Sequence, residues 1–464
     1  MAPLHGSPHA EAIRRLLSAG PGTANALSEQ LGLSQPTVSR AIRTLGDEVV
    51  RIGAARALRY ALRDERRGYG EVPVYRVDAQ GRVVLLGQLC PVRPEGHVFR
   101  EVDTANGSAG RSSYFEGLPW WLMDMRPQGF LGRAFAARYA PALSLPGSLS
   151  EWTDAHALRA LLAHGRDAVG NLLLGHAARD AFVQATAPVA IAADERAHRY
   201  TRLAAEAARG EVPGSSAGGE QPKFTTYAEA EDGSPRHVLV KFTVPEDNPV
   251  TRRWRDLLLA EHLALDTLSQ SGLVPATRSA LIDSRTVDGQ QRFLEVERFD
   301  RVGPLGRRAL HSLASLEAEF VGDATAPWPV LTRRLAEQGH ITRGAAQAAE
   351  LLYAYGTLIG NTDMHHGNLS FISETGRPYE LAPAYDMLPM GLAPRTSGAL
   401  PETLPPPQLR ADVSTQAWRL ALPVARIWLN RLKADTRLSA SFGSCLTALQ
   451  QHLDTATRQL DRLG

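Results

Sequence analysis

The sequence contains very little lysine and cysteine and has no long apolar run. Lysine occurs at only three positions in 464 residues, Lys223, Lys241 and Lys433, which leaves 48 arginines among the 51 cationic residues. The two cysteines, Cys90 and Cys445, are too few and too far apart for a disulfide framework or a zinc site, and they suit a reducing compartment. No run approaches the ~18 apolar residues of a membrane span, and the N-terminus lacks the apolar core of a secretory signal. We therefore expect a cytoplasmic protein with no membrane partner.

The charge balance excludes a uniformly polycationic protein. The 51 Lys and Arg face 49 Asp and Glu, for a formal net charge of +2. One basic domain balanced by an acidic remainder is still compatible with these totals, so charge has to be examined locally. The length predicts about three domains.

Residues 1–67 carry ten arginines and six acidic residues, a net charge of +4 on a seventh of the chain. Apolar spacing predicts helices over 10–19, 24–31 and 35–45, followed by two alternating strands, 49–53 and 58–62. Three helices followed by a strand pair are typical of a winged helix-turn-helix. The string L-S-E-Q-L-G-L-S-Q-P-T-V-S-R-A-I-R-T-L resembles winged-helix transcription factors.

The third predicted helix carries side chains suited to reading DNA. Arginine and glutamine recognise guanine and adenine edges in the major groove, and Arg56 and Arg59 on the wing would contact phosphate. The alternative is a helical docking module that reuses the fold, because acidic residues dilute the positive patch. The expected DNA-binding residues are Gln35, Thr37, Ser39, Arg40 and Arg43.

The rest of the chain divides into three predicted parts. Short strands from residue 69 predict a small β-containing subdomain over 69–148. Residues 149–300 combine helices with strands near 237–243, 280–283 and 292–297, and residues 301–464 are mainly helical. We expect an α+β protein whose nucleotide-binding part precedes a helical lobe.

Three features between residues 213 and 268 suit a nucleotide site. The loop P-G-S-S-A-G-G-E-Q-P-K at 213–223 has small residues whose backbone N–H groups can approach an anion, although it lacks Walker spacing and an ordinary loop is the alternative. Lys241 ends an apolar strand, as a lysine that reaches phosphate oxygens would. Glu261, in a helix over 254–268, is placed to pair with Lys241. The alternatives are that Lys241 points to solvent at the end of its strand and that Glu261 lies on the surface of its helix.

The most specific segment is L-I-G-N-T-D-M-H-H-G-N-L-S-F at 358–371. Asp363 and Asn368 have the D-x-x-x-x-N spacing of a kinase catalytic loop, where the aspartate orients the attacking hydroxyl and the asparagine binds metal. Asp386 follows 18 residues after Asn368 and suits Mg²⁺, which prefers oxygen ligands. The alternative for each of Asp363 and Asp386 is a side chain that only caps a turn. The H-R-D and D-F-G signatures of protein kinases are absent. The order along the chain is nevertheless that of a protein-kinase-like phosphotransferase: small-residue loop, strand lysine, helix glutamate, D-x-x-x-x-N loop and second aspartate.

These segments resemble the HipA family of bacterial serine/threonine kinase toxins over about residues 70–464. The resemblance rests on S-S-A-G-G-E-Q-P-K, V-K-F, V-E-R-F-D-R, G-N-T-D-M-H-H-G-N-L-S and A-Y-D. With a helix-turn-helix in front, the plan is similar to the YjjJ branch of that family. The resemblance implies a protein-kinase-like fold with a small β-containing N-terminal subdomain and a mainly helical C-terminal lobe.

The resemblance also implies residue roles. Asp363 would be the catalytic aspartate, Asn368 and Asp386 the Mg²⁺ ligands, and Ser216 the autophosphorylated serine whose modification shuts the enzyme off, with Ser215 adjacent. Glu220 adds a negative charge to the same loop. The implied ATP-binding residues are Ser216, Ala217, Gly218, Gly219, Lys223, Lys241, Glu297, Arg298, Phe299 and His365. Among them, Glu297 to Phe299 would form the hinge on the adenine side.

The implied activity is transfer of the ATP γ-phosphate to serine or threonine of a protein, together with DNA binding. Relatives phosphorylate aminoacyl-tRNA synthetases, so a synthetase is the implied substrate. A second hypothesis is a DNA-binding regulator whose kinase-like body only senses nucleotide or a partner. A third is a transition-metal nuclease using His365 and His366, although consecutive histidines would point apart. For the oligomeric state, a homodimer is an alternative to a monomer.

The lysine positions support the nucleotide site. Two of the three lysines fall within a nineteen-residue window, Lys223 beside the expected phosphate loop and Lys241 on the next strand, whereas every cation of residues 1–67 is arginine. We interpret this clustering as a need for a compact ammonium where a guanidinium would be too large. Lys433 has no assigned role.

Overall fold

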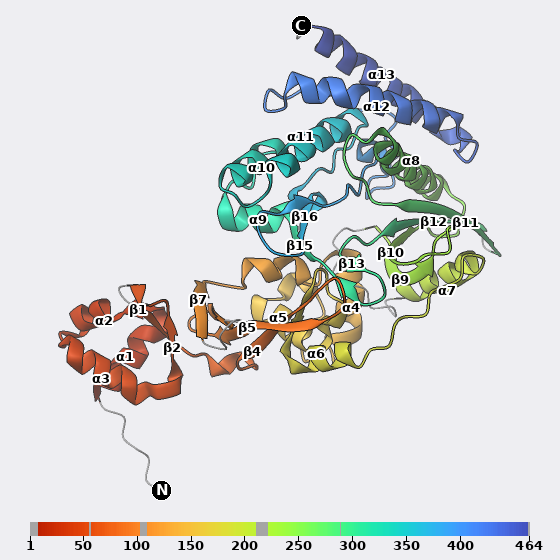
Figure 1. Ribbon diagram of the computed structural model, residues 1–464. Helices are drawn as coiled ribbons and strands as arrows, with labels where there is room; N and C mark the ends of the chain where they lie inside the picture. Colours follow the sequence, from red (N-terminus) through yellow and green to blue (C-terminus); the bar gives the residue numbers. More distant parts are fainter. Residues whose placement is uncertain (1–7, 55–56, 103–108, 210–220, 288, 463–464) are drawn as a thin grey trace.

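The computed structural model describes residues 8–54, 57–102, 109–209, 221–287 and 289–462. Figure 1 shows three units in chain order: a helical N-terminal unit in red, a middle unit in orange and yellow, and a larger C-terminal body in green and blue. None of the described helices combines the length and the hydrophobicity needed to cross a bilayer.

The N-terminal unit has the elements that the sequence predicts. Thr23 accepts a hydrogen bond from the backbone of Ala26, and Ser34 accepts one from Thr37, so both helix starts are capped as expected. A three-stranded antiparallel sheet follows in the order β1-β3-β2. The elements are α1 (Pro8–Ala19), β1 (Gly22–Thr23), α2 (Ala24–Leu31), α3 (Gln35–Leu45), β2 (Val49–Ile52) and β3 (Arg59–Leu62).

The strands of this unit pack against the middle unit. Val50 and Ile52 of β2 and Ala61 of β3 share a buried apolar cluster with three middle-unit residues, Cys90, Val92 and Val98. The backbone N–H of Gly53 donates to Oγ of Ser112 at 2.8 Å. The predicted wing is therefore part of an interdomain contact.

The middle unit is built on a five-stranded antiparallel sheet in the order β7-β6-β5-β4-β8. Its last strand, β8, comes from residues 172–174, which the sequence assigned to the nucleotide-binding part; pairing of Val74 with Leu174 instead extends the middle unit beyond residue 148. The elements are β4 (Val72–Val77), β5 (Val83–Pro91), β6 (His97–Val102), β7 (Ala109–Phe115), the 3-10 helix η4 (Trp120–Met125), α4 (Gly129–Tyr139), α5 (Asp154–His164), β8 (Leu172–Leu174) and α6 (Gly175–Val183).

A four-stranded antiparallel sheet in the order β11-β12-β10-β9 begins the C-terminal body. Helix α8 packs along β11 and β12; Asn248 caps its start, and Gly272 ends it in the left-handed conformation at φ 65°. The elements are α7 (Arg196–Ala208), β9 (Lys223–Glu229), β10 (Pro235–Phe242), α8 (Pro249–Ser271), β11 (Ser279–Thr286) and β12 (Gly289–Glu297).

The mainly helical part that follows confirms the expected C-terminal lobe. A short hairpin, β13 (Arg301–Val302) and β14 (Gly306–Arg307), leads to a three-stranded sheet in the order β15-β16-β17. The remaining elements are β15 (Ala309–Ser312), α9 (Leu313–Phe320), α10 (Trp328–Glu337), α11 (Arg343–Leu358), β16 (Ser370–Ser373), β17 (Glu380–Leu381), α12 (Thr415–Ala434) and α13 (Gly443–Asp461).

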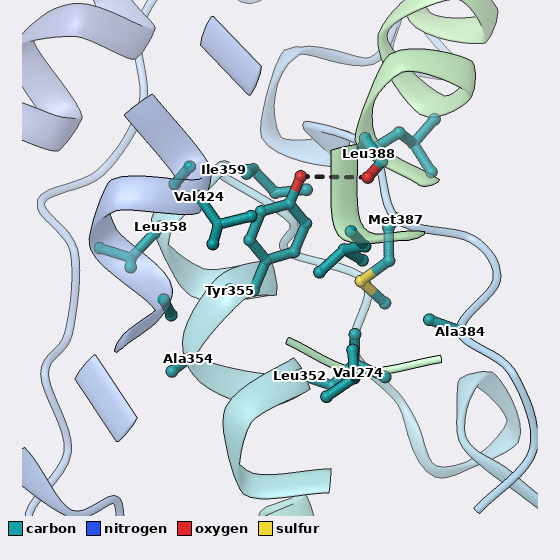
Figure 2. Close-up of a cluster of buried hydrophobic side chains, with 14 of the residues drawn as sticks. Val274, Leu352, Ala354, Tyr355, Leu358, Ile359, Ala384, Met387, Leu388 and Val424 are labelled. Carbon is teal, nitrogen blue, oxygen red and sulfur yellow. Dashed lines mark hydrogen bonds between the residues drawn. The ribbon is translucent and has the colours of Figure 1, made fainter. Parts of the chain in front are cut away.

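The main core lies beneath the segments that carry Asp363 and Asp386. Figure 2 shows Tyr355 of α11 packed among Leu358, Ile359 and Met387. The Tyr355 hydroxyl donates to the carbonyl of Ala264 in α8 at 3.3 Å. Because Met387 is fully buried and directly follows Asp386, the core fixes the backbone that presents this aspartate.

Candidate active site

A cavity of about 370 Å³ lies where the four-stranded sheet meets the loops before β16 and α12. Its wall includes residues from β9, β10 and β12, from the loop before β16, and from η4 of the middle unit. Eight residues singled out from the sequence line it: Lys223, Lys241, Glu297, Arg298, Phe299, His365, Asn368 and Asp386.

The two lysines are cross-strand neighbours. Lys241 on β10 lies opposite Lys223 on β9 in the antiparallel register, and both are buried. Two ammonium groups brought together inside a protein require nearby negative charge. The lysine cluster seen in the sequence is therefore one positive site in space.

Lys241 contacts two carboxylates. Its Nζ lies 2.6 Å and 2.8 Å from the two carboxylate oxygens of Glu261 on α8, and it also contacts Asp386. Glu261 is fully buried, so the expected Lys–Glu pair is confirmed and the surface-helix alternative is wrong. Burial alone would lower the pKa of Lys241, but Asp386 and Glu261 outweigh it and raise that pKa, which keeps the ammonium charged.

Asp386 is held in an unusual backbone conformation. Its φ is +54°, in the left-handed region that few non-glycine residues adopt, and such strain often occurs at functional sites. Burial would raise the pKa of Asp386, but Lys241 and Lys223 outweigh burial and lower it. The result is an ionised carboxylate that lines the cavity.

The loop expected to be catalytic begins where α11 ends. Gly360 has φ +78°, which turns the chain out of the helix. The next residue, Asn361, is buried: its Nδ2 donates to the carbonyl of Asp386 at 3.1 Å, and its Oδ1 accepts from the backbone of Asp363 at 3.0 Å. Asn361 thus ties the two acidic segments together. No role for Asn361 was predicted from the sequence, although it stands within the G-N-T-D motif.

Asp363 is not among the residues that line the cavity, but it stands two positions before His365, which is. Nδ2 of Asn368 donates to the carbonyl of Asp363 at 2.8 Å, which closes the loop 363–368 between the two residues of the predicted motif. The side chain is accessible to solvent. Partial burial raises the pKa of Asp363, and His365 and Lys241 oppose the rise. An accessible carboxylate with a raised pKa is suited to receiving a proton.

His365 and His366 point to different partners, as expected for consecutive residues. Nδ1 of His365 accepts from the backbone of Gly367 at 3.0 Å, and Nε2 of His366 contacts the carbonyl of Ala326 at 2.8 Å. Within the described ranges, no cluster of three His, Cys, Asp or Glu side chains could hold a metal.

Two further polar residues of the wall were not identified from the sequence. The Tyr385 hydroxyl donates to the carbonyl of Gly367 at 2.8 Å and contacts Oγ of Ser370 at 2.7 Å. Asp124 of η4 accepts from the backbone of Ser312 at 2.8 Å and from Oγ of Ser315 at 2.9 Å, at the start of α9. No local pattern could reveal Asp124, since its partners lie 188 and 191 residues away.

The side chains present fit a magnesium ion. Asp386 supplies an ionised carboxylate and Asn368 an amide oxygen, both on the cavity wall, and Mg²⁺ takes such oxygen ligands together with phosphates and water. Ser216, Ala217, Gly218 and Gly219, expected to form the phosphate loop, lie outside the described residues. Lys223, which follows that loop, lies in the cavity wall as expected.

Comparison with known proteins shows the family to which the chain belongs. Residues 69–183 match the family described as YjjJ-like toxin, middle domain, and residues 215–448 match the HipA-like C-terminal domain. Toxin YjjJ of Escherichia coli K12 is 38% identical over 450 residues, covering 97% of this chain and 98% of the relative. The chain belongs to the YjjJ-like branch of the HipA toxin family.

Two solved structures are more distant neighbours of this YjjJ-like protein. HipA of Shewanella oneidensis MR-1, solved with HipB and operator DNA, is 15% identical with a TM-score of 0.46, covering 84% of this chain and 97% of that one. The proinflammatory kinase CtkA of Helicobacter pylori is 14% identical with a TM-score of 0.36, covering 53% and 93%.

The expected adenine hinge of the YjjJ-like protein is anchored by buried charge. Nε and Nη2 of Arg298 each lie 3.0 Å from a carboxylate oxygen of Asp300, whose Oδ2 also lies 2.6 Å from Nη1 of Arg301. The Asp300 carboxylate further accepts from the backbone of Gly170 at 3.0 Å. The segment after β12 is therefore bonded to the middle unit.

The residues expected to bind DNA lie on α3 of the N-terminal unit. Gln35, Arg40 and Arg43 are exposed, whereas Thr37 and Ser39 are half-buried. On the wing, the Arg59 guanidinium lies 5.5 Å from the ring centre of Tyr114 in the middle unit. Arg56 lies outside the described residues.

Proposed function

We propose that this YjjJ-like toxin is an ATP-dependent protein kinase that phosphorylates serine or threonine in a cytoplasmic protein. The observation that carries the proposal is Lys241, a buried ammonium held by Glu261 and Asp386 within one cavity. A strand lysine paired with a helix glutamate and set beside a metal-binding aspartate is the arrangement that kinases use to hold nucleotide phosphates.

In the proposed reaction, Lys241 and Lys223 neutralise the phosphate oxygens of ATP, and the segment 297–299 receives the adenine. Asp363 orients the substrate hydroxyl and takes its proton while the hydroxyl oxygen bonds to the γ-phosphorus. The bond from the γ-phosphorus to the bridging oxygen breaks, and ADP leaves. Little other covalent chemistry is required of the protein.

Asp386 and Asn368 would hold Mg²⁺ at the phosphate end of the cavity. The ion would supply charge neutralisation on the triphosphate. Because Asp386 contacts Lys241 directly, one carboxylate would serve both the ammonium and the ion. Through its two hydrogen bonds, Asn361 would fix the backbone of Asp386 relative to the backbone of Asp363.

Self-inhibition through Ser216, or its neighbour Ser215, is part of the proposal and rests on the family resemblance. DNA binding through α3 is a second part. It is supported by the exposed, outward-facing Gln35, Arg40 and Arg43 on a helix capped by Ser34. An aminoacyl-tRNA synthetase is the proposed substrate by the same resemblance.

Incubation of the full chain with γ-labelled ATP and Mg²⁺ in a cell extract tests the proposal. We expect label on the chain itself, mapping to Ser216 or Ser215, and on at least one other protein. Asp386→Asn should abolish both signals, whereas Asp232→Asn, at an exposed turn, should change neither. Binding of ATP with no transfer to any protein would favour the nucleotide-sensing regulator instead.

A further inference from the structure

The hydroxyl of Tyr385 connects the segment that carries Asp386 to the loop that carries Asp363. It donates to the carbonyl of Gly367 at 2.8 Å and lies 2.7 Å from Oγ of Ser370. Tyr385, Gly367 and Ser370 all line the candidate active-site cavity. None of the three has a part in the reaction proposed above.

The direction of both hydrogen bonds follows from the groups that make them. A tyrosine hydroxyl carries one proton, and a carbonyl oxygen can only accept. The Tyr385 proton is therefore used on Gly367, and the Ser370 hydroxyl donates to the Tyr385 oxygen. Hydrogen bonds in series polarise one another, so the serine strengthens the bond from Tyr385 to Gly367.

The tyrosine that carries this hydroxyl is itself well supported. Its ring packs against Phe299 of the expected adenine hinge, with ring centres 5.6 Å apart and 36° between the planes. Two positions further along the chain, Met387 is fully buried in the main core. Ser370, on β16, is also buried. The core therefore fixes the Tyr385 hydroxyl at the point where it contacts Gly367.

Gly367 directly precedes Asn368, the residue proposed to bind Mg²⁺. The carbonyl of Gly367 and the N–H of Asn368 belong to one planar peptide group, so a bond that fixes the carbonyl also fixes the backbone from which the asparagine side chain extends. Nδ2 of Asn368 donates to the carbonyl of Asp363 at 2.8 Å. Because the amide nitrogen is engaged in this way, Oδ1 is the atom that can ligate a cation.

We infer that the Tyr385 hydroxyl is a positioning group for phosphotransfer, which holds the Gly367 peptide and thereby sets the place of Asn368 Oδ1 in the proposed Mg²⁺ site. Ser370 acts through Tyr385 by orienting that hydroxyl. The effect on Mg²⁺ and on phosphotransfer rests on the proposed function. The hold on the loop 363–368 is a property of the chain alone and is tested separately.

Amide hydrogen exchange of the full chain without nucleotide tests the hold on the loop. Tyr385→Phe removes the hydroxyl and keeps the ring, and we expect the amides of 364–369 to exchange about fivefold faster in this variant. Tyr379→Phe is the matched control and should leave this exchange unchanged, because Tyr379 is a buried tyrosine whose ring contacts His311 and which is not among the lining residues. Equal exchange in Tyr385→Phe and the unmodified chain would overturn the inference.

Calorimetric titration of ATP in EDTA and in Mg²⁺ tests the effect on the metal site. In EDTA, Tyr385→Phe should bind ATP within about twofold of the unmodified chain, because the ring and both cavity lysines remain. The gain in affinity that Mg²⁺ provides should fall about tenfold, as expected when the support of a metal ligand is lost. A loss of affinity that is equal in EDTA and in Mg²⁺ would place the effect on the nucleotide and overturn the inference. Failure of the unmodified chain to bind ATP in either condition would refute the proposed function but not the hold on the loop.

The rate of label transfer from γ-labelled ATP gives an independent readout. Tyr385→Phe should lower the rate about tenfold and Ser370→Ala about threefold. The double variant should be no slower than Tyr385→Phe alone, because Ser370 acts through the hydroxyl already removed. Effects that multiply in the double variant would contradict the role given to Ser370. A normal rate in Tyr385→Phe would overturn the inference and leave the proposed function intact, whereas no transfer by the unmodified chain would refute the proposed function.

Discussion

Lys241 and Asp386, 145 residues apart in the chain, contact each other through their charged groups, and Glu261 holds the same ammonium at 2.6 Å. The contact joins the β10 strand to the segment that follows the catalytic loop. Charged groups concentrated in one buried place are costly unless they are paired. Their pairing makes the phosphate end of the cavity sensitive to the size and charge of each member.

Lys241→Arg tests whether the site requires a compact ammonium. The planar guanidinium cannot occupy the same space between Glu261 and Asp386, so the phosphate contact should be displaced by about 1 Å and phosphotransfer should fall about 100-fold. Lys433→Arg is the matched control, since Lys433 lies on α12 and contacts Gln450. Equal activity of the two variants in the labelled-ATP assay would contradict the role of Lys241.

Asp300→Asn should destabilise the junction between the hinge and the middle unit. The substitution removes the buried negative charge shared by Arg298 and Arg301. Breaking such a buried cluster lowers the free energy of unfolding by about 3–5 kcal/mol. Urea unfolding should show the loss as a lower midpoint. Asp232→Asn, with a carboxylate that is 59% exposed, should shift the midpoint little.

Stability should fall as pH drops from about 6.5 toward 4. Burial lowers the pKa of both His97 and His311 to about 4, whereas an unfolded histidine titrates near 6.5. Between these values the unfolded chain binds protons that the folded chain does not, so acid favours unfolding by about 3 kcal/mol per histidine at pH 4. Urea unfolding at pH 7, 5.5 and 4.5 measures this effect. His97→Gln should make it smaller, and an unchanged pH dependence in that variant would count against the assignment.

Arg40→Ala and Arg43→Ala should weaken DNA binding. Loss of a base contact costs about 1–3 kcal/mol of binding free energy and relaxes the sequence preference. Loss of a phosphate contact instead reduces the slope of log K against log salt concentration by about one. Gel-shift titrations over a salt series with selected operator fragments separate these outcomes. Arg82→Ala is the control on the middle unit. If neither α3 variant differed from this control, α3 would be a docking surface and not a DNA reader.

Local sequence patterns predicted most elements and the groups near one another in the chain. Alternating and helical spacing predicted β10, α8 and the pairing of Lys241 with Glu261. Asp363, Asn368 and Asp386 followed from their spacing in polar segments between apolar ones. The capping residues Thr23 and Ser34 likewise predicted the start of α2 and α3.

Contacts between residues far apart in the chain could not be predicted from local sequence patterns. Asp124 meets Ser312 only because the middle unit packs on the start of α9. Strand β8 has three residues and acquires its role from pairing with β4. The wing strands alternate as a free hairpin would, yet Val50 and Ile52 are buried against the middle unit.

The most direct test of the central claim compares ATP binding and phosphotransfer in Asp363→Asn. The account predicts that the variant binds ATP within about threefold of the unmodified chain, because Asp363 is not among the residues that line the cavity, and loses phosphotransfer by a factor of about 10²–10⁴. The measurement is calorimetric titration of ATP together with the rate of label transfer from γ-labelled ATP on the same preparations. Normal label transfer by Asp363→Asn would contradict the account.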